Sequence, residues 1–423
     1  MKKDKFVDFL IFTSIFVSTI TFFTNPFEGY LHYFIFLLLL PFFISRYGLP
    51  KAPFQIIFLP FFIGVFQIMM GNNEWFLFFK IFLGLLLSTI FYYYVIQYYE
   101  MNIERMFNLY LKWSYWTAVI GIIQYVSFKI HFSPGYDYGW LHFNKWAVVS
   151  SGEGLIRINS IYMEPSQLGI MLGPAAFVAI LNIFRKQNLE YKNYQNYIIL
   201  IAMYLSKSST GYIGLFFVIV IIGLNLGYLS YLGLLLAIGF LVGFGLYNSV
   251  DEFKSRIDAA LGLWLHQDFD IKNVNTSSFV QYNNAHIAYN NFKEHPIFGT
   301  GIGSHPVAFE KYSYTRSIVK IKGFDNNSAD ANSLLLRIMS ETGLMGLFFI
   351  IAIVIQCFVG NDGIDNKYWV ISGAILVLIL LYLFRQGNYF VNGFPFFVWL
   401  YYYNKKAYLE EKQNNLAINA TAV

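Results

Sequence analysis

Two short motifs, HPIFGTGIGSH at residues 295–305 and DANSLLLRIMSETGLMG at residues 330–346, organise this sequence. The first motif carries glycine at every second position, and glycine takes backbone conformations that are closed to other residues. Its glycines are Gly299, Gly301 and Gly303. The second motif begins an apolar helix, and Asn332 is its predicted N-cap because the side chain can accept hydrogen bonds from free N–H groups. The two motifs therefore predict a tight turn followed by a helix that enters a membrane.

The second motif also places two charges, Arg337 and Glu341, one helical turn apart. At positions i and i+4 they are spaced to neutralise each other on one helix face. Charges at the boundary of a membrane are costly, and for that reason they also mark candidate functional positions. The spacing alone leaves both interpretations open.

The composition is that of a membrane protein. Of 423 residues, 57% are hydrophobic, 21% aromatic and 13% charged, whereas a soluble domain carries about 25% charged residues. The net charge of +5 does not indicate nucleic-acid binding, because the basic residues lie in short loops between apolar segments. The single cysteine, Cys357, excludes an internal disulfide and a cysteine metal site. The N-terminus is positive and then apolar without a small-residue cleavage site, which predicts a retained first helix.

A spanning helix needs about 20 apolar residues. The predicted helices are 6–23, 30–45, 53–71, 76–99, 107–128, 167–184, 230–248, 333–359, 368–387 and 393–403. The apolar run 196–228 is interrupted by SKSST at 206–210, so it forms either one long helix or two helices that meet at the break. If this run forms two helices, the short loops that carry Lys and Arg lie on the same side of the membrane as Lys405 and Lys406. Because short cytoplasmic loops are enriched in Lys and Arg, we predict about 12 helices with both termini cytoplasmic.

This topology predicts an all-α polytopic membrane protein with most of its polar sequence outside. The segments are N-terminal transmembrane helices (1–128), a first outer loop (129–166), central transmembrane helices (167–248), a large outer loop (249–331), C-terminal transmembrane helices (332–403) and a cytoplasmic tail (404–423). Structureless loops above about 15 residues are usually functional or disordered. The large loop carries amphipathic patterns at 253–264 and 279–292, which predict helices. We therefore expect the function on the outer face.

Several charged residues lie where predicted helices meet that face. Glu164 falls in the first turn of a helix, where the dipole favours a carboxylate, so it is either a simple cap or half of a reactive pair with Arg157. Lys207 lies in the SKSST break and either snorkels to the surface or binds a ligand, while neighbouring hydroxyls satisfy broken backbone bonds. Arg385 follows a long apolar run and either snorkels or faces a polar cavity.

Three arginines, Arg157, Arg337 and Arg385, lie on separate segments but on the same predicted side of the membrane. Guanidinium groups bind phosphate bidentately, so three of them converging would suit a lipid-linked pyrophosphate. His295 and His305 flank the glycine turn, but the spacing of a metal site is missing. The sequence GTGIGSH lacks the strand of a dinucleotide-binding unit. No metal and no cofactor is predicted.

Four stretches together resemble the bacterial O-antigen polymerase/ligase superfamily. They are RINSIYMEPS at 157–166, LSKSSTG at 205–211, HPIFGTGIG at 295–303 and DANSLLLRIMSETGLMG at 330–346. The resemblance implies a glycosyltransferase of the GT-C type in the bacterial inner membrane, with its active site facing the periplasm. Its donor and acceptor would be undecaprenyl-diphosphate-linked oligosaccharides, and it would need neither metal nor nucleotide sugar. Such proteins commonly work with a chain-length regulator.

The motifs then assign roles by position. The catalytic candidates are Glu164 as general base, His295 or His305 as the second choice, and Asp330 as the third. The diphosphate-binding candidates are Arg157, Arg337, Arg385 and Lys207. The motif and structural positions are Pro165, Ser208, Gly299, Gly301, Gly303, Asn332, Glu341 and Gly343.

Two departures from the family pattern bear on the reaction. Ligases of this family usually carry His-Asn where this chain has Ala331 and Asn332, which favours a repeat-unit polymerase over a ligase. In the motif at 205–211, family members often carry Ser-Arg, whereas this chain has Ser208 and Ser209. Lys207 is therefore the candidate that replaces the arginine as the cation. The alternatives are an O-antigen ligase that transfers glycan to lipid A–core or protein, and a lipid-linked oligosaccharide flippase. The missing internal repeat is evidence against the flippase.

Overall fold

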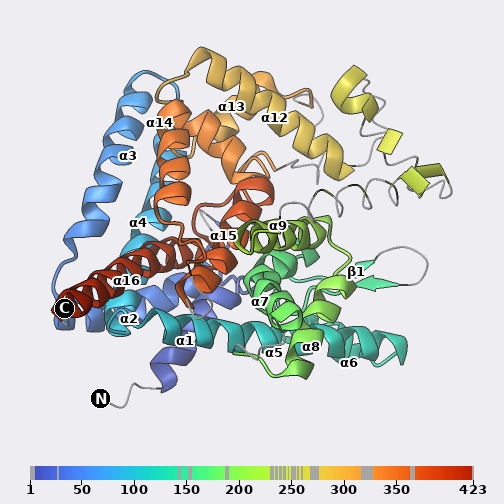
Figure 1. Ribbon diagram of the computed structural model, residues 1–423. Helices are drawn as coiled ribbons and strands as arrows, with labels where there is room; N and C mark the ends of the chain where they lie inside the picture. The colour runs from blue at the N-terminus through green and yellow to red at the C-terminus, as the bar shows by residue number, and fades with distance from the viewer. Residues whose placement is uncertain are drawn as a thin grey trace.

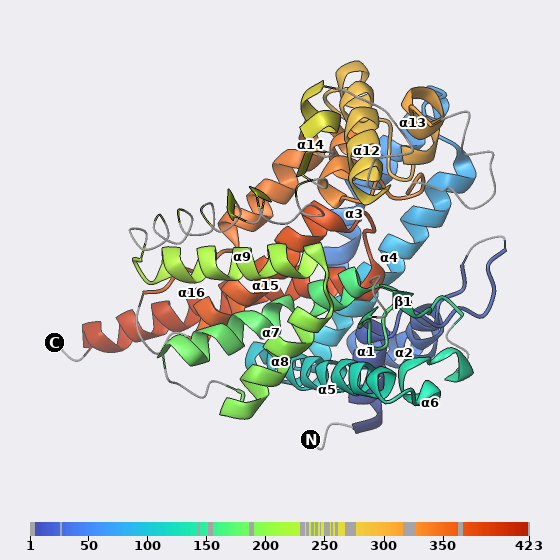
Figure 2. The same ribbon diagram turned by 90° about the vertical axis from the view of Figure 1, so that its right-hand side faces the viewer.

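The computed structural model describes residues 5–25, 28–141, 144–150, 155–185, 190–228, 261–266, 276–315, 327–362 and 367–421, with isolated positions between 233 and 258. Within these ranges the chain is helical except for one short antiparallel hairpin and its connections. Figure 1 shows α12 and α13 above α14, and Figure 2 shows α7, α9 and α15 running side by side.

The first half of the chain contains the helices α1 (Lys5–Phe16), α2 (Leu31–Tyr47), α3 (Lys51–Met69), α4 (Trp75–Tyr98), α5 (Ile103–Lys129), α6 (Ser133–Tyr136), η1 (Gly139–Leu141), α7 (Pro165–Arg185) and α8 (Asn193–Leu205). The strands β1 (Val149–Ser150) and β2 (Ile156–Arg157) form the hairpin. The second half contains α9 (Ser209–Asn225), η2 (Gly262–His266), α12 (Thr276–Glu294), α13 (His305–Tyr312), α14 (Leu334–Gln356), α15 (Lys367–Arg385), η3 (Val391–Gly393) and α16 (Phe394–Thr421).

Five helices of the described chain are long and apolar enough to cross a membrane: α3, α4, α7, α14 and α15. Two shorter apolar helices, α2 and α9, accompany them. The predicted all-α membrane class is therefore confirmed, while about 12 spans and a GT-C fold stay predictions. The predicted helix 230–248 lies largely outside the described residues.

α7 and α15 form the centre of the bundle. In the most apolar window of α7, 78% of the residues are buried inside the protein, against 22% for α3. A helix that is apolar all round and buried all round belongs to the core. α3 and α4 instead expose rows of Phe and Leu side chains, as helices that face lipid do. The central helices are thus the rigid elements on which a site can be built.

The polar interruption at 206–210 breaks the helix, as the two-helix interpretation predicted. α8 ends at Leu205 and α9 begins at Ser209, and Lys207 between them has a φ of +44°. The Ser206 hydroxyl donates to the carbonyl of Met203 over 2.7 Å. A hydroxyl in this position satisfies a backbone group that the break leaves open.

Some predicted boundaries were wrong. α1 ends at Phe16 rather than at 23, because Thr19 leaves the helix to donate its hydroxyl to the Ile161 carbonyl. Asn332 is not the N-cap of α14. It has a φ of +54°, and Ser333 is the cap, with its hydroxyl accepting from the Leu336 N–H over 3.3 Å.

Other boundaries are also informative. α16 continues far beyond residue 403, to Thr421. The amphipathic pattern at 279–292 folds as α12, which confirms that prediction. Of the earlier pattern at 253–264, the structure describes residues 254, 257, 258 and 261–264, which are helical, and the last three of them lie in the π-helical turn η2.

Candidate functional site

The glycine motif docks on a kink in α14. Gly343 bends this helix with a φ of +61° and a ψ of −151°, which frees backbone groups that a straight helix would pair. Two of these groups, the N–H groups of Leu344 and Met345, donate to the carbonyls of Pro296 and Ile297 over 2.8 and 3.1 Å. The motif thus completes the hydrogen bonding of the kink, as membrane helices require.

The glycine motif approaches the backbone of α14 closely because each side of this contact carries a glycine. A Cβ at Gly343 would lie 2.6 Å from the Pro296 carbonyl oxygen. A Cβ at Gly299, which has a φ of +60°, would lie 2.4 Å from the carbonyl carbon of Glu341. Real Cβ atoms do not approach backbone this closely, so both positions exclude larger residues. On the near side of the kink, the Gly301 N–H donates to the Glu341 carbonyl over 2.7 Å.

Arg337 and Glu341 form an ion pair, which is one of the two interpretations that their spacing left open. The Arg337 Nε donates to Glu341 Oε1 over 2.9 Å, and the side chains are 1% and 0% exposed. The Glu341 carboxylate also accepts the N–H groups of Gly303 and His305, over 2.9 and 3.2 Å, and the hydroxyl of Tyr389 over 2.8 Å. A buried charge is stable only with such partners. Glu341 is therefore the acceptor that holds three segments together.

Arg337 extends the same network toward the end of α15. Its Nη1 donates to the Gly387 carbonyl over 2.9 Å, and its guanidinium lies 4.7 Å from the centre of the Tyr389 ring. Its Nη2 is buried without a hydrogen-bond partner among the described residues. A Cβ at Gly387 would meet the Asp330 carbonyl oxygen at 1.5 Å, so the two loops touch. Arg337 thus positions the loop that follows Arg385, and the structure gives it no exposed face toward a ligand.

His305 is also enclosed. Its Nε2 lies 2.9 Å from Asn284 Oδ1, and its side chain has no exposed surface. Since the Asn284 amide nitrogen donates to the Val280 carbonyl, its oxygen is the acceptor and the imidazole is the donor. Burial, and secondarily the charge of Arg337, lowers the pKa of His305 to about 3. This environment suits a neutral structural histidine, whereas His295 at the end of α12 is partly exposed.

A second group of candidates gathers at the α8–α9 break. The N–H of Ile158, next to Arg157 on β2, donates to the Leu205 carbonyl over 3.4 Å. This contact brings Arg157 to the break that contains Lys207. Arg157 is also near enough to Tyr212 on α9 to interact with it electrostatically. Both cations are partly exposed.

The first turns of α7 and α9 meet at the same place. A Cβ at Gly169 would lie 2.9 Å from the Gly211 Cα, so two glycines let the helices touch. Gly169 is the fifth residue of α7 and Gly211 the third of α9, so the helix N-termini are neighbours. The Ser208 side chain makes no capping hydrogen bond to the described residues. Helix N-termini with free N–H groups attract anions.

Glu164 and Arg385 complete this group. Glu164 immediately precedes α7, is exposed, and accepts the Ser166 hydroxyl over 2.9 Å. Its carboxylate is close enough to the guanidinium of Arg385 for an electrostatic interaction. Arg385 in turn donates through Nη1 to Gln281 Oε1 on α12 over 3.0 Å. An anionic side chain at the start of α7 thus lies within electrostatic range of a cationic side chain at the end of α15.

Asp330 belongs to the loop that meets Gly387. Its carboxylate accepts the Asn332 N–H and the Asn327 amide, each over 3.1 Å. It also interacts electrostatically with Arg337. The sequence thus identified most of the charged residues. It missed Tyr389, Gly387 and Gln281, and the only signal for the first two was the polar break QGNY within apolar sequence.

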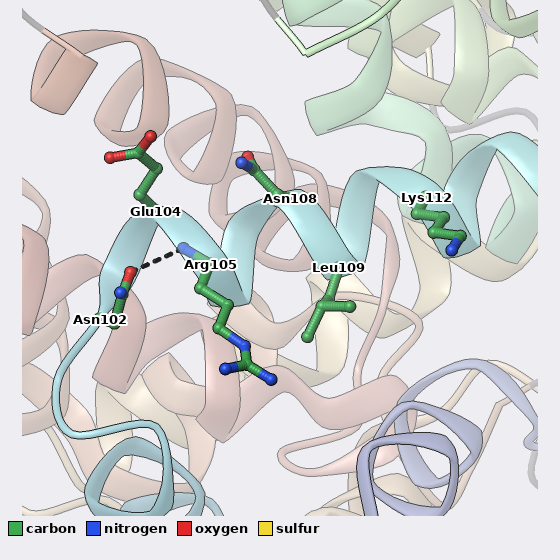
Figure 3. Close-up of a pocket in the computed structure, with 6 residues that line it drawn as sticks. All are labelled: Asn102, Glu104, Arg105, Asn108, Leu109 and Lys112. Carbon is green, nitrogen blue, oxygen red and sulfur yellow. Dashed lines mark hydrogen bonds between the residues drawn. The ribbon is translucent and has the colours of Figure 1, made fainter. Parts of the chain in front are cut away.

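A separate shallow pocket of about 450 Å³ lies along the first turns of α5. Figure 3 shows Glu104 and Asn108 pointing to one side of that helix and Arg105 and Leu109 to the other. Ion pairs connect this region to α1 and α15, from Arg105 to Asp8 over 3.4 Å and from Lys367 to Glu104 over 2.9 Å. None of the candidate site residues lines it.

The fold and the two charged groups define an integral membrane protein with a polar site at the ends of its core helices. The family model described as O-Antigen ligase matches residues 197–351, which supports the predicted resemblance to the O-antigen polymerase/ligase superfamily. The matched range contains three of the four stretches that carried the resemblance, and only 157–166 lies outside it. No curated protein matches the chain. The family supports a function of the polymerase or ligase type and does not favour a flippase.

Proposed function

We propose that this protein is a polymerase of polyprenyl-diphosphate-linked oligosaccharide repeat units. The observation that carries the proposal is the convergence at the α8–α9 break. Arg157 and Lys207 lie there beside the N-termini of α7 and α9, and Glu164, which precedes α7, is within electrostatic range of Arg385. Guanidinium groups and helix N-termini are two independent devices for binding phosphate. A diphosphate bound there would have a carboxylate within reach of the sugar that it carries.

In the proposed reaction the protein stabilises the leaving group and removes one proton. The oxygen of an acceptor hydroxyl attacks the anomeric carbon of the donor, forming the glycosidic bond. The bond between that carbon and the diphosphate oxygen breaks, and the lipid diphosphate leaves with the electron pair. Arg157, Lys207 and Arg385 stabilise its charge, which is often the largest catalytic contribution. Glu164 takes the proton of the hydroxyl as general base, and direct attack inverts the anomeric configuration.

Arg337 and Glu341 enter this proposal as positioning residues. Their buried pair fixes the loop at Gly387, two residues after Arg385, against the Asp330 loop. His295 and Asp330 stay alternative bases because both are partly exposed. A polymerase is favoured over a ligase because Ala331 stands where family ligases usually carry histidine. Ala331 is fully buried with a φ of +60°, and its methyl group offers no acid or base.

The test is a gel of surface glycan from a strain that lacks the gene and is complemented with variants. Arg157→Ala and Glu164→Gln should each leave single repeat units, because transfer to the final acceptor survives while extension stops. Arg46→Ala, an exposed arginine beside Tyr47, should restore the full ladder. Equal expression of each variant in the membrane fraction is the control for folding.

The surface glycan of the deletion strain itself distinguishes a polymerase from a ligase. Single units on the surface support the polymerase, whereas long chains that stay on the polyprenyl lipid would identify a ligase. An unchanged ladder in the deletion strain would refute this family of functions for the protein. A normal ladder with Arg157→Ala would remove that residue from the diphosphate site.

A further inference from the structure

α12 carries a cluster of aromatic side chains that the proposed reaction does not use. Trp264 of η2 meets Tyr282 edge to face, with ring centres 5.1 Å apart. Tyr282 stacks on Tyr314 at 6.1 Å with an angle of 13° between the rings. Tyr314 lies on the ring of His286 at 4.1 Å. These four residues are called the aromatic platform below.

Contacts between separate segments hold the aromatic platform in place. Three separate segments, η2, α12 and the residues after α13, converge on it. Leu263 of η2 is fully buried against Phe279 and Tyr282. The Tyr314 N–H donates to Asn283 Oδ1 over 3.0 Å, and the Asn283 amide donates to the Ser313 hydroxyl over 3.0 Å. Ring positions fixed in this way lose little further freedom on binding a ligand.

Two of the rings are partly exposed, and polar groups lie at the edge of the platform. Trp264 is 49% exposed and Tyr314 is 41% exposed. The Tyr314 hydroxyl lies 2.9 Å from the His286 Nδ1, and the Asn290 amide lies 3.1 Å from the His286 Nε2. Burial lowers the pKa of His286, so its imidazole is neutral at pH 7. The surface therefore combines aromatic faces with neutral hydrogen-bonding groups and carries no charge of its own.

We infer that the aromatic platform binds the glycan portion of the acceptor, as an elongated sugar chain laid along α12. Aromatic faces carry negative charge density and attract the C–H groups of a pyranose ring. Amide, hydroxyl and imidazole groups match the sugar hydroxyls. The helix that carries the platform also contacts the proposed transfer site, because Gln281 of α12 accepts from Arg385 over 3.0 Å. The inference rests on the proposed function, since it names the binding site for the acceptor of that reaction.

The rival occupant is the lipid headgroup region, because exposed Trp and Tyr also gather at membrane interfaces. The neutral amide and imidazole edge favours the glycan, since a headgroup surface offers charged phosphate. Binding of lipid-free glycan distinguishes the two. The probes are oligosaccharides of one, two and four repeat units, released by mild acid from the surface polysaccharide of the producing strain. They contain no lipid and no diphosphate, so the diphosphate-binding groups of the transfer site do not contribute to their binding.

The purified full-length protein is titrated with these probes in detergent, with saturation-transfer NMR as the readout. We expect affinity to rise from one to four repeat units. Trp264→Ala and Tyr314→Ala should each weaken binding of the longest probe by about three- to tenfold, the value of one aromatic contact. Tyr314→Phe keeps the ring and should bind within about twofold of the wild type. Trp116→Ala, in α5 and 54% exposed, is the matched control and should change nothing.

Absence of binding by the wild-type protein would overturn the inference. So would alanine variants that bind like the wild type, or variants that lose membrane retention while glycan affinity is unchanged. If Trp264→Ala does not fold, Tyr314→Ala against Tyr314→Phe decides the question. The two hypotheses fail in different ways. If only the glycan-binding inference is wrong, the deletion strain loses its ladder but no probe binds the protein. If only the proposed polymerase function is wrong, the probes bind while the deletion strain keeps an unchanged ladder.

Discussion

Replacing Glu341 with alanine tests the claim that a buried ion pair joins α14 to the glycine motif. The substitution removes the acceptor of four donors: Arg337 Nε, the N–H groups of Gly303 and His305, and the Tyr389 hydroxyl. Removing one partner of a buried pair costs about 3–5 kcal/mol, because the other charge stays buried without compensation. The two orphaned N–H groups each carry a further desolvation cost of about 1–3 kcal/mol. We therefore expect Glu341→Ala to lower the free energy of unfolding by about 5 kcal/mol or more.

The assay is thermal unfolding of the detergent-solubilised protein, followed by tryptophan fluorescence. A loss of this size in a chain of 423 residues corresponds to a fall in Tm of roughly 4–10 °C. Glu341→Gln keeps an acceptor but loses the charge, so its Tm should be intermediate. The double variant Arg337→Met with Glu341→Gln removes both charges and should be more stable than Glu341→Ala, because no uncompensated charge is left.

Glu104→Ala is the matched control. Its carboxylate forms an ion pair with Lys367 over 2.9 Å, the same distance as the buried pair, but both side chains are about half exposed. An exposed pair of this kind contributes about 0–1 kcal/mol. Equal losses in Tm for Glu341→Ala and Glu104→Ala would refute the reasoning. A double variant as unstable as Glu341→Ala would show that the hydrogen bonds, rather than the charge, hold the segments.

Two further predictions concern the same region. Gly303→Ala should destabilise the protein by about 3 kcal/mol or more, because at a φ of +84° its Cβ would lie 2.6 Å from the Leu77 carbonyl oxygen. Gly71→Ala, with a φ of +75° and no atom within 4 Å, should cost only about 1 kcal/mol, so similar Tm values would contradict the steric argument. His305 is neutral in the folded protein, and its pKa rises from about 3 to 6.5 on unfolding. Its contribution to the free energy of unfolding is therefore fully present above pH 6.5 and is lost as the pH falls toward 3. Between pH 6.5 and pH 5 the wild type should lose about 2 kcal/mol more than His305→Gln, measured by Tm at each pH, and parallel pH profiles would refute the assignment.

The sequence predicted those features of the fold that depend on local pattern. The SKSST stretch places three serines, a threonine and a lysine within apolar sequence, and the helix breaks there as expected. The spacing of Arg337 and Glu341 allowed mutual pairing as one of two interpretations, and the two side chains do form an ion pair. The charges on the two sides of the α8–α9 break were also identified from their positions at helix ends.

Features that depend on distant contacts were not predictable in this way. Asn332 and Ser333 are both good cap residues, and the choice follows from the Ser333 hydroxyl donating to the Leu383 carbonyl, 50 residues away. The burial of His305 depends on Asn284 in α12, and the position of the Arg385 loop depends on Arg337. No local pattern indicates which of several arginines will be enclosed.

The kink at Gly343 has a consequence for biosynthesis. Leu344 and Met345 hydrogen-bond to Pro296 and Ile297, which precede them in the chain by almost 50 residues. Ribosomal synthesis therefore delivers the docking segment before the helix that needs it. If α14 entered the lipid alone, these N–H groups would face hydrocarbon without partners. We therefore predict that the stable insertion of α14 depends on the seating of residues 296–301, and that a variant unable to seat this segment exposes α14 to membrane proteases.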